Sequence, residues 1–112
     1  MAVYVSNIVI EQGFDFDTSF QLEDTRSNAF LNLTGAATTA QIRKHPTAST
    51  AVSFGTSVSS PEQGIISITM TAAKTASLKA GRYVYDVKLT TLDGSEYKAV
   101  EGAALVRAGV TR

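Results

Sequence analysis

The sequence contains no cysteine. Disulfide bonds, thiolate metal sites and a cysteine nucleophile are therefore excluded. Small secreted domains commonly depend on disulfides, so this absence favours assembly in a reducing cytosol. The 112 residues are expected to form one domain, residues 1–112. A domain of this size without cross-links has a modest core, and it often gains stability by oligomerising or by docking on a partner.

The sequence also lacks an excess of either charge, since Lys and Arg number 10 and Asp and Glu number 10. Nucleic-acid binding requires a basic surface, so no nucleic-acid partner is predicted. A neutral chain has little long-range steering, and its association with a partner should depend only weakly on salt. No apolar run approaches the roughly 20 residues of a membrane helix. Met1–Val5 has no signal-peptide pattern, so neither a membrane partner nor export is expected.

Groups that could carry out catalysis are scarce. The single histidine, His45, lies between Lys44 and Pro46, outside any recognisable Ser-His-Asp arrangement, and is predicted to be an exposed loop residue. One histidine without cysteine cannot supply the three or four ligands of a zinc site. The eight glycines fall singly, and none forms a phosphate-binding loop. The chain is predicted not to be an enzyme and to hold no metal or other cofactor.

Two residue groups leave alternatives open. Asp15, Asp17 and Glu23 could suggest calcium, but alternate carboxylates on a strand lie about 7 Å apart, which suits no single ion. A solvated outer face of the strand is therefore favoured. Tyr83 and Tyr85 could stack on bases or sugars, but they share a face with the apolar Val87 and Leu89, so a core position is favoured.

Alternation of apolar and polar residues is the strongest pattern that is present. A period of two predicts half-buried strands, and three segments show it clearly. The apolar faces of these three segments are Phe14, Phe16, Phe20 and Leu22; Ile66, Ile68 and Met70; and Tyr83, Tyr85, Val87 and Leu89. Asp93-Gly94 after the third segment predicts a two-residue type I′ turn and a return strand from Ser95 or Glu96. Glu101-Gly102 in the return strand is predicted to be a bulge that changes its phase.

The remaining elements are shorter. Thr71–Ala80 is predicted to contain one or two helical turns, with Thr71 as the N-cap and Gly81 just past the end. The other expected strands and connections are a strand at about Val3–Ile10, a turn at Asp24–Asn28, strands at Phe30–Leu33, Thr38–Lys44 and Val52–Thr56, a loop at Pro61–Gly64 and a tail at Ala108–Arg112. About seven or eight short strands separated by frequent turns predict an all-β fold, an antiparallel β-sandwich with one short helix.

Several blocks of the sequence resemble a family of small phage virion proteins, similar to the N-terminal domain of the BppU-type upper-baseplate protein of siphophages. The blocks are Glu11-Gln12-Gly13, Leu33-Thr34-Gly35, Gln41-Ile42-Arg43-Lys44, the segment 71–80 leading into Gly81-Arg82-Tyr83-Val84-Tyr85-Asp86, and Glu101-Gly102. The resemblance covers most of the chain. It implies an immunoglobulin-like sandwich, a structural role in a phage particle, and assembly in the host cytoplasm into the virion.

The function expected from these features is assembly with other virion proteins, in several copies. A tail, baseplate or fibre-attachment adaptor is favoured, because the domain of the baseplate relatives attaches a receptor-binding apparatus to the tail, although this sequence departs from them in having no linker helices or receptor-binding region after the domain. The alternatives are a capsid decoration or cement protein and a carbohydrate- or receptor-binding module. Contacts are expected in segments that are least needed for the core, including the Ser/Thr-rich 48–60. The terminal residues chosen as contacts are Ala2, Val3, Tyr4, Val5, Val110, Thr111 and Arg112.

Overall fold

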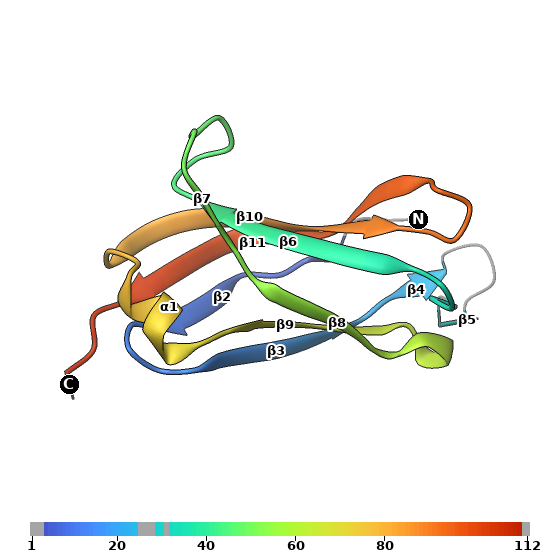
Figure 1. Ribbon diagram of the computed structural model, residues 1–112, viewed down its shortest axis with the longest axis horizontal. Helices are drawn as coiled ribbons and strands as arrows, with labels where there is room; N and C mark the ends of the chain where they lie inside the picture. Colours follow the sequence, from blue (N-terminus) through green and yellow to red (C-terminus); the bar gives the residue numbers. More distant parts are fainter. Residues whose placement is uncertain (1–3, 25–28, 31, 111–112) are drawn as a thin grey trace.

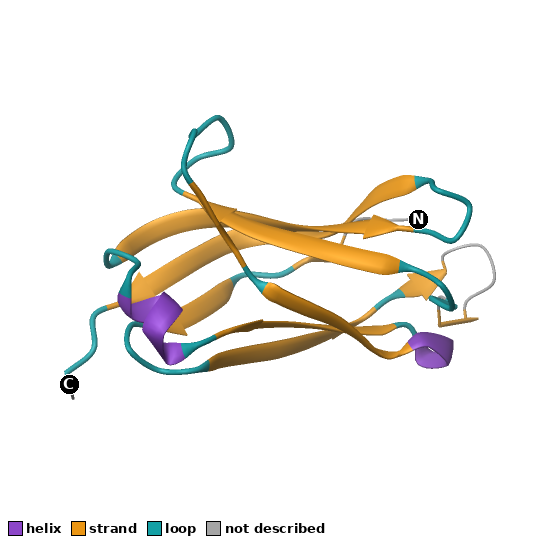
Figure 2. Cartoon of the chain, in the orientation of Figure 1, coloured by secondary structure: helices purple, strands orange, loops and turns teal. Residues whose placement is uncertain are grey.

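Two β-sheets face each other across a shared core, as Figure 1 shows. The computed structural model describes residues 4–24, 29–30 and 32–110. The strands are β1 Tyr4–Val5, β2 Ile8–Glu11, β3 Phe16–Gln21, β4 Glu23–Asp24, β5 Ala29–Phe30, β6 Ala37–Arg43, β7 Ala51–Ser53, β8 Gly55–Ser60, β9 Ile65–Met70, β10 Gly81–Thr90 and β11 Glu96–Arg107. The helices are the 3-10 turn η1, Pro61–Gln63, and α1, Ala72–Ala76, at opposite ends of the sandwich (Figure 2).

The predicted β-sandwich is confirmed. Sheet A has the order β1-β11-β10-β6-β7, with β2 also on β11, and sheet B has the order β3-β9-β8. The pair β4 and β5 forms a small separate ladder. Most pairings are antiparallel as predicted, but β1 and β2 both pair with β11 in parallel. The expected single N-terminal strand is thus two short strands, separated at Ser6 and Asn7.

The strand order is that of an immunoglobulin-like sandwich. In that fold one sheet carries the second, fifth and fourth strands side by side, and the other carries the last, sixth and third. Sheet B (β3-β9-β8) and the centre of sheet A (β11-β10-β6) follow this order. Tyr83, near the start of β10, donates its hydroxyl to the Lys79 carbonyl at 2.7 Å. This contact is the tyrosine corner typical of the fold, and Tyr85 occupies the place two residues on where antibody domains have a cysteine.

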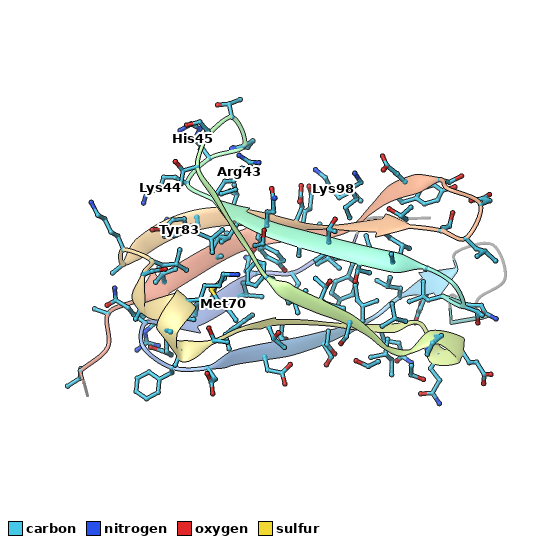
Figure 3. All side chains as sticks on the ribbon, viewed as in Figure 1. Arg43, Lys44, His45, Met70, Tyr83 and Lys98 are labelled. Carbon is cyan, nitrogen blue, oxygen red and sulfur yellow. The ribbon has the colours of Figure 1, made fainter. Side chains whose placement is uncertain are left out.

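The core lies between the sheets and is built from the alternating residues identified in the sequence. Ile66, Ile68 and Met70 of β9 are buried, as are Tyr85, Val87 and Leu89 of β10. Figure 3 shows Met70 pointing between the sheets. Ala40 and Ile42 of β6 face the same interior. Phe54 contributes a ring 6.2 Å from that of Tyr85, in an edge-on arrangement that aromatic pairs favour.

Phe14 is not a core residue, contrary to the prediction. Gly13 has φ +87° and turns the chain before β3 begins at Phe16, so the alternation of β3 does not reach Phe14. The Phe14 side chain is 48% exposed. The predicted strand Val52–Thr56 is also wrong as one strand, because β7 belongs to sheet A and β8 to sheet B. The chain crosses between the sheets at the buried Phe54, whose N–H donates to the Ala40 carbonyl at 3.0 Å.

The hairpin between β10 and β11 has a three-residue loop, not the predicted two-residue turn. The Thr91 N–H donates to the Ser95 carbonyl at 2.8 Å, and Leu92, Asp93 and Gly94 lie between these residues. Gly94 has φ +88°, the left-handed conformation that this loop type needs at its last position. A hydrogen bond from the Thr91 hydroxyl, with a second from the Ser95 N–H, lowers the pKa of the Asp93 carboxyl.

The bulge in β11 lies at Ala99, not at Glu101-Gly102. Val87 pairs with Val100 and Lys88 pairs with Lys98, which leaves Ala99 as the extra residue. Ala99 and Val100 are consequently both buried. The extra residue shifts the alternation of β11 by one position, so the odd-numbered Tyr97 does not continue the pattern of the buried Ala104 and Val106. Gly102 has a different role. A Cβ atom there would lie 2.0 Å from the Ser6 carbonyl oxygen, so glycine permits the close approach of the N-terminal segment.

The short helix begins as predicted and ends earlier. The Thr71 hydroxyl accepts a hydrogen bond from the Lys74 N–H at 3.3 Å, which confirms the N-cap. The helix ends at Ala76 with Ser77 as its C-cap, so Gly81 is the first residue of β10 and not the residue after the helix. The segment carries the chain from the centre of sheet B to the centre of sheet A. The predicted loop at Pro61–Gly64 contains η1.

The segment between β3 and β6 contains less regular secondary structure than predicted. The predicted strand Phe30–Leu33 is reduced to β5, Ala29–Phe30. Leu31 lies outside the described residues, whereas Leu33 is a buried core residue whose N–H donates to the Pro61 carbonyl at 2.7 Å. Of the predicted turn Asp24–Asn28, residues 25–28 also lie outside the described residues.

The Thr75 side chain joins α1 to the turn before β3 through hydrogen bonds. Its fully buried hydroxyl accepts from the Gly13 N–H at 3.0 Å and donates to the Phe14 carbonyl at 2.9 Å. Thr75→Val keeps the shape and removes both bonds, so we expect the free energy of unfolding to fall by about 1–2 kcal/mol. Urea unfolding measures this loss. Thr75→Ser, which keeps the hydroxyl, should lose clearly less, and an equal loss in both variants would assign the effect to packing.

Candidate interaction surface

A row of small hydroxyl side chains crosses the outer face of sheet B. Ser19, Ser67 and Ser59 follow one another across its three strands, with oxygen–oxygen distances of 3.1 Å and 2.6 Å. None of the large exposed hydrophobic residues in the described part of the chain lies on β3, β8 or β9. This face offers hydrogen bonds to water and little apolar surface to a partner.

The outer face of sheet A carries apolar side chains between ion pairs. Val9 of β2 lies opposite Leu105 of β11, and these side chains are 48% and 40% exposed because they alternate with buried neighbours. Lys98 Nζ lies 3.2 Å from Glu101 Oε2 and 3.8 Å from Asp86 Oδ2. Figure 3 shows Lys98 on this side of the sheet. The outer faces of the two sheets therefore differ in chemistry, and the outer face of sheet A offers more apolar surface to a partner.

A groove separates β2 of sheet A from β3 of sheet B, and we call it the β2–β3 groove. Its volume is about 520 Å³, and its lining is Ser6, Asn7, Ile8, Val9, Glu11, Phe14, Asp15, Phe16, Asp17 and Thr18. Within the described residues, β2 pairs only with β11 and β3 only with β9. Each strand thus turns an unpaired backbone edge toward this side of the sandwich, where unpaired N–H and C=O groups can accept another strand.

Short polar contacts fix both walls of the groove. The Ser6 N–H donates to the Glu101 carbonyl at 2.9 Å, and the Ala103 N–H donates to Asn7 Oδ1 at 3.1 Å, so the break between β1 and β2 is held against β11. On the other wall, Asp15 Oδ1 accepts from the Ala72 N–H at 2.7 Å. The Tyr4 and Phe20 rings, with centroids 5.9 Å apart, connect β1 to β3.

The structure places two of the predicted contact residues on β1, next to β11. Tyr4 and Val5 form β1 at the free end of sheet A and are 49% and 70% exposed. Val110 is 95% exposed after the end of β11. Ala2, Val3, Thr111 and Arg112 lie outside the described residues. Of the predicted terminal contacts that the structure describes, Tyr4 and Val5 are thus part of sheet A, whereas Val110 lies beyond its last strand.

The segment 48–60 is only in part a surface segment. Its first residues belong to the β6–β7 loop, which rises with Lys44 and His45 beyond the outer side of sheet A (Figure 3). Phe54 is buried, and Val52 and Val58 pack against the core. The expectation that this segment contributes little to the core is wrong for its second half.

Three exposed residues of the groove and of sheet A were missed by the sequence reasoning: Val9, Phe14 and Leu105. Val9 stands between Ile8 and Ile10 in an apolar run, and only the parallel pairing with β11 shows which of the three faces outward. Phe14 had the phase of a core residue. A signal for Leu105 was present, since it alternates with Ala104 and Val106.

The residues considered for chemistry form no site within the described part of the chain. His45 is exposed, and its Nδ1 lies 3.1 Å from the Thr47 hydroxyl. No group of three or more His, Asp or Glu side chains there is placed to hold a metal ion. Tyr83 and Tyr85 belong to the tyrosine corner and the core, as favoured, and the Lys44 ammonium lies 4.7 Å from the Tyr83 ring centre. Among the described residues, no helix has the length and apolar character needed to cross a membrane.

Burial raises the pKa of the Tyr85 phenol above its usual value of 10.0. A raised pKa means that the folded state holds this proton more tightly than the unfolded state. The associated stability is complete below about pH 10 and is lost as the pH rises through the folded-state pKa. Wild type should therefore lose stability more steeply than Tyr85→Phe between about pH 9 and 11 in urea unfolding. Parallel losses in the two proteins would contradict this assignment.

Comparison with known proteins gives likeness in structure only. No protein-family model matches the chain, and no curated protein sequence matches it. An internalin-like protein of Listeria monocytogenes superposes with a TM-score of 0.48 and 17% identity, over 94% of this chain and 28% of its own length. Murine CRIg superposes with a TM-score of 0.42 and 14% identity, over 92% of each chain. Both TM-scores lie below 0.5, and the fold assignment rests on the strand order and the tyrosine corner.

Proposed function

We propose that this chain is a structural protein of a bacteriophage virion that assembles with other virion proteins as a tail, baseplate or fibre-attachment adaptor. The phage assignment rests on the sequence blocks described above. The structural observation that supports an assembly role is the exposure of large apolar side chains on β1, β2 and β11 of sheet A, whereas, among the described residues, β3, β8 and β9 of sheet B expose none. The exposed side chains on sheet A are Tyr4, Val5, Val9, Tyr97 and Leu105.

Such a domain would act by shape, backbone hydrogen bonding and apolar contact, without a reaction. The proposed assembly takes place in the host cytoplasm, and the protein is present in several copies in the particle. Because the net charge is 0, incorporation should change little between low and moderate salt. Binding to particles in 50 mM and 300 mM NaCl measures this, and a collapse at the higher concentration would contradict it.

Fractionation of the virus tests the location. Purified particles are separated into heads and tails, and the protein is quantified in each fraction by mass spectrometry. Enrichment in tails is expected. Presence only in heads would favour the capsid decoration alternative, and absence from both would overturn the virion role. Specific glycan binding by the isolated domain would favour the carbohydrate-binding alternative.

A further inference from the structure

We propose that the β2–β3 groove binds an extended segment of a partner chain, which adds a strand to the open edge of β3 and carries basic residues beside apolar ones. This deepens the adaptor role and rests on that proposed function only for the identity of the chain that supplies the segment. The inference depends on three properties of the groove: its open backbone edge, its apolar walls and its charge.

The backbone edge is long enough for strand addition. β3 has six residues, Phe16–Gln21, and its ladder with β9 runs along the whole strand. Its other edge has no strand partner in the described residues. Strand addition at such an edge supplies main-chain hydrogen bonds for affinity, while alternate side chains of the added segment reach neighbouring pockets.

The walls of the groove offer apolar contact on the side that faces β2. Val9 and Phe14 are each 48% exposed, and Phe16 is half-buried against the core. Alternate side chains of an added strand point the same way, so every second residue would face these walls. An aliphatic residue there would contact Phe14 and the accessible part of Phe16.

The charge of the groove selects the occupant. Its lining contains the carboxylates of Glu11, Asp15 and Asp17 and no Lys, Arg or His, although the chain as a whole is neutral. Arg107 lies 3.4 Å from Glu11 and offsets one of these charges at the margin. Basic residues on the added strand would lie beside the acidic ones, a cross-strand arrangement that is favourable.

The same charges oppose a second copy of this chain as the occupant. Two copies paired edge to edge through β3 would bring Asp15 and Asp17 of both chains to one ladder, and like charges in such positions are destabilising. Acidic side chains on an edge strand thus discourage self-pairing while they permit a basic partner.

A peptide titration followed by NMR tests this directly. The probe is a nine-residue peptide in which valines alternate with lysines and threonines, and its control has glutamate in place of each lysine. With 15N-labelled protein we expect the lysine peptide to shift the amide signals of residues 16–21 and to slow their hydrogen exchange. The glutamate peptide should bind several-fold more weakly. No shift at 2 mM peptide, shifts centred on another surface, or concentration-dependent shifts of these amides without peptide would each overturn the proposal.

A charge reversal separates the groove from a general charge effect. Asp17→Lys changes an exposed side chain and should move the preference toward the glutamate peptide by about two- to fivefold for each charge contact. Glu62→Lys, an equal charge change on the exposed η1 outside the groove, should leave the preference unchanged. Equal responses of the two variants would overturn the proposal. Absence of the protein from virions would refute the adaptor role and leave peptide binding intact, whereas failure of peptide binding would leave the virion role standing.

Discussion

Leu89→Ala is expected to lower the free energy of unfolding by about 2–5 kcal/mol. Leu89 is fully buried on β10, the strand of sheet A that pairs with both β11 and β6. Removal of the side chain loses its transfer free energy and leaves a cavity, because strands on both sides hold the backbone in place. Urea unfolding followed by fluorescence or circular dichroism measures the change.

Leu105→Ala is the matched control, since it deletes the same atoms from a side chain that is 40% exposed on the neighbouring strand. We expect it to cost about 1 kcal/mol or less. If the two variants lost similar stability, the assignment of the inner and outer faces of sheet A would be wrong. The comparison therefore tests the orientation of β10 and β11 as well as the magnitude of the core contribution.

The alternating segments are the part of the fold that the sequence could predict. Ile66–Met70 and Tyr83–Leu89 have a period of two, and burial of one face of a sheet follows from that period alone. The N-cap at Thr71 was predictable for a similar reason, because a hydroxyl at that position satisfies an N–H group only three residues away. Each of these features is decided locally.

Features that depend on a distant segment could not be predicted. Nothing near Ala99 in the sequence marks it as the bulge, because the bulge is a mismatch in register between β10 and β11. In the sequence, Phe54 looks like the centre of a single strand. The segment forms two strands because the residues before Phe54 pair in sheet A, as β7, and those after it pair in sheet B, as β8. The β2–β3 groove has the same origin, since its walls come from strands in different sheets.

The blocks that resemble phage virion proteins coincide with contacts that join separate elements. The Gln12 side chain donates to the Leu78 carbonyl at 2.7 Å, and the Gly13 N–H donates to Thr75. Gly102 lies against Ser6. These residues determine how separate elements of the domain are held together. The surface residues that are proposed to determine the choice of partner, Val9 and Asp17 among them, lie outside these blocks.

Gly102→Ala is the second change with a large expected effect. The new Cβ atom would lie 2.0 Å from the carbonyl oxygen and 2.7 Å from the carbonyl carbon of Ser6, and these are backbone atoms that cannot rotate away. The N-terminal segment must move from β11, which breaks the Ser6–Glu101 hydrogen bond and the contact from the Tyr85 hydroxyl. Overpacking and the loss of these bonds together should cost about 2–4 kcal/mol.

The same substitution should weaken the groove, because Ser6, Asn7 and the start of β2 form one of its walls. Hydrogen exchange is expected to accelerate at Ser6 and Ala103, whose N–H groups bond across the β1–β11 and β2–β11 contacts, and the lysine peptide should bind more weakly to the folded fraction. Ala103→Val enlarges the next residue of β11 at an exposed position and should change stability by less than about 0.5 kcal/mol. If Gly102→Ala matched that control in both stability and exchange, the N-terminal strands would not be docked on β11 as described. Loss of exchange protection confined to the N-terminal segment would instead mean that the docking of β1 and β2 on β11 is among the least stable contacts of the fold. This edge would then be the part of the domain that a binding partner can most readily order.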